Sequence, residues 1–103
     1  MATGTDIVIN DKIDFDIKEP RLWKVILLND DRTPMDFVID LLKDVFKHQE
    51  ETAKNITLDI HNTGSGIAGV YSYEIAEHKG VEVKTIASSQ GFPLQVKLEA
   101  EAS

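Results

Sequence analysis

The sequence predicts an α+β domain in which a three-stranded antiparallel sheet packs on three helices, in the order β-α-α-β-α-β. Short runs of strand-forming residues occur at residues 22–28, 67–73 and 94–98. Longer stretches with apolar residues at helical spacing occur at residues 34–47, 49–60 and 74–89. A chain of 103 residues is long enough for one domain with one small core.

The first strand and the first helix are joined by a polar turn. Asn29, Asp30 and Asp31 follow the apolar run and break it, as turn-forming residues do. Thr33 followed by Pro34 is typical of a helix N-cap with proline at the first helical position. The helix then carries apolar residues on one face: Val38, Leu41, Leu42 and Val45. We therefore expect an acceptor-rich turn held between two buried elements.

The remaining elements are set by glycine, proline and periodicity. Residues 61–66 read as a turn with two glycines, which we expect to end the second helix. Gly69 inside the second strand predicts a bulge or a close approach of another backbone. Residues 90–93, which include a Gly and a Pro, end the third helix. The last strand shows the alternation of a half-buried strand.

The ends of the chain are expected to lie outside the core. We expect residues 1–20 to form a flexible extension, residues 21–100 the core domain and residues 101–103 a frayed C-terminus. Residues 7–9 fit either a short edge strand or part of a disordered arm, and we expect the arm.

Composition narrows the class of partner. A net charge of −7 disfavours nucleic-acid binding, because phosphate backbones would repel the domain. No cysteine is present, and no apolar run reaches the length of a membrane helix. The N-terminus has no basic residue before Lys12 and no apolar segment of signal-peptide type. We expect a cytoplasmic monomer without signal or transit peptide that binds neither nucleic acid nor membrane.

The turn at Asn29, Asp30 and Asp31 is the densest polar group, and it has two interpretations. It can be a solvated turn that supports the following helix N-terminus, or a set of acceptors for a cation or an ammonium group. A calcium site fits poorly, because calcium loops are longer and close with a Glu. Magnesium stays open as an alternative.

The histidines and hydroxyl residues do not predict catalysis. His61, at the end of the second helix, can be a surface residue that interacts with the helix dipole, or a neutral imidazole acceptor. The three histidines lack the spacing of a zinc site. Ser65 lies in no nucleophile elbow, and the glycines around it form no phosphate loop. We expect no metal, no cofactor and no enzymatic activity.

The start of the third helix is charged. Glu74, Glu77 and Lys79 fit a solvated face, or a surface that docks on a partner. The local pattern does not choose between these two interpretations.

Residues 29–38, NDDRTPMDFV, resemble the signature of the ClpS family, N-D-D-x-T-P-M-[ED]-F-V. Further matches follow in order at His61, at residues 69–71, at residues 74–77 with Lys79, and at residues 93–94. The resemblance spans about residues 20–99, nearly all of the expected core. It implies an adaptor that binds proteins whose first residue is bulky and hydrophobic, a signal called an N-degron. The adaptor would deliver them to a ClpA- or ClpC-type AAA+ unfoldase for proteolysis.

The resemblance also implies roles for individual residues. The α-amino group would be held by Asn29, Asp30 and His61, with Asp31 as possible support. The side-chain pocket would be lined by Leu27, Thr33, Met35, Val38, Thr57, Ile60 and Leu94. Glu74 and Lys79 would dock on the N-terminal domain of the unfoldase. Thr57 departs from the Met of many relatives, which implies a roomier pocket with altered selectivity.

Two alternatives remain beside the degron adaptor. A protein of this fold could dock on an unfoldase and regulate it without recognising degrons. It could also be a general interaction module, as the C-terminal domain of the ribosomal stalk is, whose fold ClpS resembles. An acceptor-only group beside apolar positions favours the adaptor, because an α-ammonium donates hydrogen bonds and accepts none.

Overall fold

The computed structural model describes residues 8–9 and 21–101. The elements in chain order are β1 (Val8–Ile9), β2 (Trp23–Leu28), α1 (Met35–Asp44), α2 (Glu50–Thr63), β3 (Ser65–Tyr71), α3 (Tyr73–Ser89) and β4 (Gln95–Ala100). The strands form one sheet in the order β1-β4-β2-β3, and β2 pairs antiparallel with both β3 and β4. The three helices and the three-stranded antiparallel sheet are confirmed in the predicted order.

The N-terminal prediction is wrong for two residues. Val8 and Ile9 pair parallel with Lys97 and Leu98 of β4, so the alternative of a short edge strand applies to them. The other residues of the expected 1–20 extension lie outside the described residues, as do residues 102–103.

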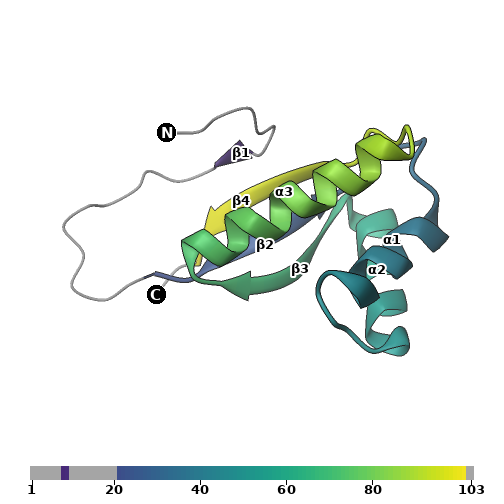
Figure 1. The fold of residues 1–103 in the computed structure, drawn as a ribbon. Coiled ribbons are helices and arrows are strands. Elements are labelled where there is room, and N and C mark those ends of the chain that lie inside the picture. The colour runs from purple at the N-terminus through teal and green to yellow at the C-terminus, as the bar shows by residue number, and fades with distance from the viewer. Residues whose placement is uncertain (1–7, 10–20, 102–103) are drawn as a thin grey trace.

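The core is formed by the sheet together with all three helices, and α3 runs along one face of the sheet (Figure 1). Val25 and Leu27 of β2 pair with Leu98 and Val96 of β4, and all four side chains are fully buried. Ala76, Gly80, Val83 and Ala87 give α3 a narrow buried face, which lets the helix approach the strands closely. The helices α1 and α2 lie beside the end of the sheet where β2 ends and β3 begins (Figure 1). No described helix is long and apolar enough to cross a membrane.

The start of α1 differs from the prediction. Pro34 occupies the cap position and no side chain caps the helix, so Thr33 is not the N-cap. The Thr33 hydroxyl instead donates to Asp30 Oδ2 at 2.7 Å. The helix ends at Asp44, three residues before the predicted end at residue 47. Lys47 has a φ of 62°, in the left-handed region, so it cannot continue a right-handed helix.

The end of α2 also differs. The helix continues to Thr63, so His61 lies in its last turn and not in the predicted turn at residues 61–66. Gly64, with φ 97°, is the C-cap, and its N–H donates to the Ile60 carbonyl at 3.0 Å. This left-handed conformation suits glycine and ends the helix immediately before β3.

The bulge predicted at Gly69 is confirmed, but the group that approaches this glycine is a side chain of the same strand and not another backbone. The register of β2 and β3 shifts between Val25 and Ile26, which marks a bulge near Gly69. A Cβ at Gly69 would come within 2.7 Å of two ring carbons of Tyr71. The absent side chain therefore gives the Tyr71 ring space beside the strand.

Candidate functional site

The turn after β2 is organised by the carboxylate of Asp30. Its Oδ1 accepts hydrogen bonds from the backbone N–H groups of Arg32 at 2.7 Å and Thr33 at 2.8 Å. Its Oδ2 accepts from the Thr33 hydroxyl at 2.7 Å. A turn bonded in this way at both carboxylate oxygens has little freedom, so Asp30 is fixed in one orientation.

These hydrogen bonds also change the acidity of Asp30. Partial burial of the carboxyl would raise its pKa, because burial disfavours the charged form. The hydrogen bonds from Thr33 and Arg32, together with the positive charge of Arg32, act in the opposite direction. The net result is a pKa below the ordinary value of 3.8, so Asp30 is ionised at neutral pH.

The structure brings the predicted α-amino residues to one end of the sheet. Leu28 of β2 pairs with Ser65 of β3, and the Asn29 N–H donates to the Gly64 carbonyl at 2.9 Å. The polar turn therefore lies against the end of α2, whose last turn carries His61. The side chains of Asn29 and His61 are exposed, as is that of Asp31. An exposed group of acceptors at this junction can be reached by a charged donor.

The predicted side-chain pocket divides into a buried part and an accessible part. Five of its residues are buried, and they come from β2, α1, α2 and the segment before β4: Leu27, Val38, Thr57, Ile60 and Leu94. All of them except Thr57 belong to the main apolar core cluster. Thr33 is half-buried, and the side chain of Met35 is 39% exposed. Met35 and Val38 are three positions apart in α1, so they lie on the same side of that helix.

Thr57 is the one buried polar residue of the described chain. Its side chain is 3% exposed, and its hydroxyl donates to the Ala53 carbonyl at 2.8 Å within α2. The hydroxyl is thus satisfied locally, and Thr57 presents its methyl group to its surroundings. In packing terms Thr57 behaves as a small β-branched apolar residue.

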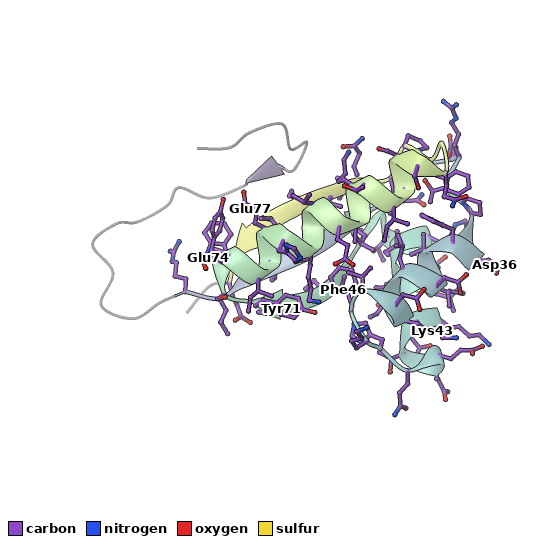
Figure 2. The ribbon with its side chains drawn as sticks, viewed as in Figure 1. Asp36, Lys43, Phe46, Tyr71, Glu74 and Glu77 are labelled. Atoms are coloured by element: carbon purple, nitrogen blue, oxygen red, sulfur yellow. The ribbon has the colours of Figure 1, made fainter. Side chains whose placement is uncertain are left out.

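The two predicted docking residues differ in their surroundings. Glu74 is exposed in the first turn of α3, beside Ile75, which is 50% exposed (Figure 2). Lys79, five residues further along α3, is half-buried, and its Nζ donates to the Val45 carbonyl at 2.8 Å. Because Trp23 pairs with Tyr71 and Leu28 pairs with Ser65, Glu74 and Asp30 lie at opposite ends of the sheet.

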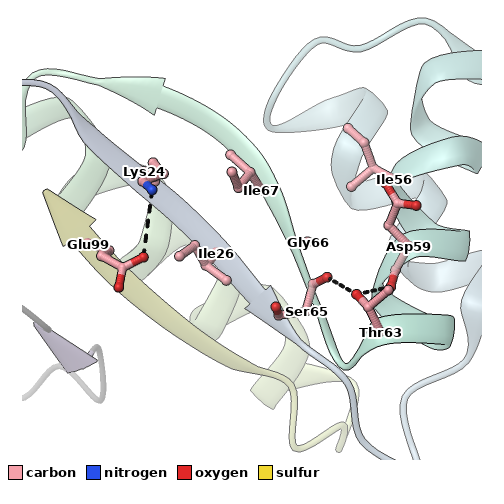
Figure 3. Close-up of a pocket in the computed structure, with 9 residues that line it drawn as sticks. All are labelled: Lys24, Ile26, Ile56, Asp59, Thr63, Ser65, Gly66, Ile67 and Glu99. Carbon is pink, nitrogen blue, oxygen red and sulfur yellow. Dashed lines mark hydrogen bonds and ion pairs between the residues drawn. The ribbon is translucent and has the colours of Figure 1, made fainter. Parts of the chain in front are cut away.

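A separate groove of about 530 Å³ lies on the sheet face away from α3 (Figure 3). It is bordered by Ile26, Ile67 and Gly66 and, at one end, by an ion pair of Lys24 with Glu99 at 3.8 Å. At the other end the Thr63 hydroxyl contacts the carbonyls of Asp59 and Ser65. None of the predicted pocket residues lines this groove. Among the described residues, no group of three or more His, Cys, Asp or Glu side chains could hold a metal ion.

Two features of the site were missed in the sequence. The bond between Asp30 and Thr33 has a local signal, because an Asp three residues before a Thr can form such a turn. The second is His48, which is half-buried with its Nε2 at 2.6 Å from the Ala68 carbonyl. That contact joins segments 20 residues apart and has no local signal.

Known proteins resemble the chain over most of its length. A sequence model described as "ATP-dependent Clp protease adaptor protein ClpS" matches residues 18–97. The chain is 52% identical over 83 residues to the ATP-dependent Clp protease adapter protein ClpS of Bdellovibrio bacteriovorus, covering 81% of this chain and 73% of that protein. It is 42% identical over 99 residues to the ClpS of Wolinella succinogenes, covering 96% of this chain and 97% of that one.

A solved structure agrees with these relatives. The structure of Agrobacterium tumefaciens ClpS2 bound to L-phenylalaninamide has a TM-score of 0.78 and 41% sequence identity to this chain. The match covers 81% of this chain and all of that one. The chain therefore belongs to the ClpS family of ATP-dependent Clp protease adaptor proteins, which are adaptors and not enzymes.

Proposed function

We propose that this adaptor binds the free N-terminus of proteins whose first residue is bulky and hydrophobic, and delivers them to a ClpA- or ClpC-type AAA+ unfoldase. The single observation that carries the proposal is the junction where the Asp30 turn meets the end of α2, with Asn29 and His61 exposed on either side. In support, L-phenylalaninamide, to which ClpS2 is bound, combines a free α-amine with an aromatic side chain.

The hydrogen-bond capacity of Asp30 suits an α-ammonium. A carboxylate offers about four acceptor positions on its two oxygens. Three are occupied by Arg32 N–H, Thr33 N–H and the Thr33 hydroxyl. One position stays available for the ligand, on a carboxylate that the turn already holds in place. We assign the other two hydrogen bonds of the ammonium to the Asn29 amide oxygen and a neutral His61 nitrogen.

The first side chain of the ligand would enter the region of Leu27, Val38, Thr57, Ile60 and Leu94. Met35 is the exposed residue on the same side of α1 as Val38. We propose that Met35 and Thr33 form the mouth of the pocket, because a thioether side chain adapts easily to different partners. Burying a Leu or Phe side chain contributes roughly 1.5–3 kcal/mol. An internal residue has no ammonium, so it would forfeit the hydrogen bonds at Asp30.

Docking on the unfoldase is assigned to the start of α3. Glu74 and Ile75 are exposed there, at the end of the sheet away from the degron site. This separation lets the adaptor hold a substrate and an unfoldase together. Both sites lie in the expected core of residues 21–100, and we propose that the adaptor acts as a cytoplasmic monomer.

Binding of labelled peptides that differ only in the first residue tests the proposal. Peptides beginning with Phe, Leu, Trp, Ile or Met are compared with an N-acetylated Leu peptide. We expect the free bulky termini to bind and the acetylated peptide to fail, because acetylation removes the charge and two donors. Equal binding of free and acetylated Leu would refute degron recognition and favour an unfoldase regulator.

A further inference from the structure

The ammonium group of Lys79 is engaged inside the protein. Its Nζ donates to the carbonyl of Val45, which is the C-cap residue of α1, at 2.8 Å. The last carbonyls of a helix have no partner within the helix, and they carry the negative end of its dipole. A lysine at this point supplies both a donor and a positive charge, so it stabilises the end of α1 from the neighbouring helix α3.

The same ammonium lies over two aromatic rings. Its Nζ is 5.9 Å from the centroid of Phe46 and 5.4 Å from that of Tyr71. The two rings stack at 6.4 Å with an interplanar angle of 28°, and Figure 2 shows them side by side next to α3. A lysine over the face of an aromatic ring is attracted by its quadrupole. Phe46 follows α1 and Tyr71 ends β3, so the contact joins α1, β3 and α3.

The connection between α1 and α2 is held by further contacts. The His48 N–H donates to the Leu42 carbonyl at 3.0 Å, and His48 Nε2 lies 2.6 Å from the Ala68 carbonyl of β3. Gly69 leaves space for the Tyr71 ring. Residues 45–48 are thus fastened to the sheet and to α3 at several points.

We propose that Lys79 is a positioning residue for degron recognition. It sets the place of α1, and through the connection that of α2, relative to the sheet. These two helices carry Val38, Thr57 and Ile60, whereas Leu27 lies in β2 and Leu94 in the segment just before β4. The pocket assigned above lies between these two groups, so a shift of the helices changes its width. This inference rests on the proposed function, because it takes a peptide with a bulky first residue as the ligand.

Three variants separate this role from unfoldase docking. Lys79→Met keeps the aliphatic stem but removes the charge and the donors. Lys79→Arg retains a charge, donors and the ability to stack on the rings. Glu74→Gln changes the exposed docking residue and no contact of Lys79. Affinities for a Phe-initiated peptide and for an isolated unfoldase N-terminal domain are measured for each, with amide hydrogen exchange of the ligand-free proteins.

We expect Lys79→Met to weaken peptide binding by about tenfold, from the loss of a charge-assisted hydrogen bond and a cation–π contact. Lys79→Arg should stay within about threefold of the wild type, because it can replace both contacts. Glu74→Gln should leave peptide affinity unchanged. Amide exchange of α1 and of residues 45–48 should be faster in Lys79→Met. Should that variant not fold, Lys79→Gln, which keeps a neutral donor, is expected to show the same changes at smaller size.

Two results would overturn the proposal. The first is a folded Lys79→Met protein with unchanged amide exchange in α1 and unchanged peptide affinity. The second is a Lys79→Arg protein as defective as Lys79→Met. A wild-type protein that binds no peptide refutes the proposed function instead, and the exchange measurement then still tests whether Lys79 holds α1 in place.

Discussion

The two ends of the sheet are built in different ways. At the end where β2 meets β3, Asp30 is held by three hydrogen bonds and the Asn29 backbone is tied to Gly64. At the other end, the first turn of α3 presents Ile75 and Glu74 to solvent, and Figure 2 shows Glu74 at this end. A small charged ligand is recognised best by groups already in position, because their ordering costs nothing on binding. A protein partner can use a broad exposed surface, so this contrast agrees with the proposal that one end binds a peptide N-terminus and the other end an unfoldase.

The strongest test of this contrast is Asp30→Ala. It removes the proposed ligand acceptor and also the group that organises the turn. We expect peptide affinity to fall by about a hundredfold, or about 2.7 kcal/mol. Asp30→Asn, which keeps one oxygen, should be intermediate. Fluorescence anisotropy with a Phe-initiated peptide measures both. Unfoldase binding, at the opposite end of the sheet, should be unaffected; a parallel loss there would show that the two ends are not independent.

The next test concerns the width of the pocket. Thr57→Met adds volume at a buried position whose hydroxyl is already bonded to Ala53. We expect affinity for Ile- and Trp-initiated peptides to fall by about tenfold relative to Leu, as overpacking typically costs 1–3 kcal/mol. Thr57→Val is the matched control, because it removes the hydroxyl and keeps the shape. A preference order identical in all three proteins would remove Thr57 as a selectivity residue.

A third test probes His61 by substitution. A neutral imidazole nitrogen can accept a hydrogen bond from the ammonium of the ligand. We expect His61→Ala to lower peptide affinity by about fivefold, because one acceptor is lost. His61→Gln, which keeps an uncharged acceptor, should bind nearly as well as the wild type. If His61→Ala binds the peptide as tightly as the wild type, His61 does not contact the amine.

The smallest expected effect is on stability in acid. The pKa of Asp30 is lower in the folded protein than its ordinary value of 3.8. Its ionised form therefore contributes stability above that value, and this contribution is lost as pH falls through the folded pKa. Solvent screening limits it to less than about 1 kcal/mol. Urea unfolding of wild type and Asp30→Asn should show a difference at pH 7 that shrinks near pH 2.5, whereas Glu74→Gln should track the wild type.

Local pattern was sufficient for the order and type of the core elements. The apolar run of β2, the helical spacing of Val38 and Leu42, and the alternation in β4 each reflect which face is buried. The turn formers after Leu28 and the glycine at position 69 also predicted the turn and the bulge correctly. The residues of the polar turn could be predicted from a short motif, because the hydrogen-bonding groups of this turn lie close together in the sequence.

Long-range packing was needed for the rest. Thr33 was expected to cap α1 by accepting a hydrogen bond from a backbone N–H. Its hydroxyl instead donates to the charged carboxylate of Asp30, and a hydrogen bond to a charged group is the stronger of the two. The two residues Val8 and Ile9 find their partners almost ninety positions away in β4. Lys79 fits a surface charge by its local pattern, yet its ammonium contacts Val45, Phe46 and Tyr71, which come from two other segments of the chain. Such contacts depend on how helices and strands pack together, so the residues next to them in the sequence do not predict them.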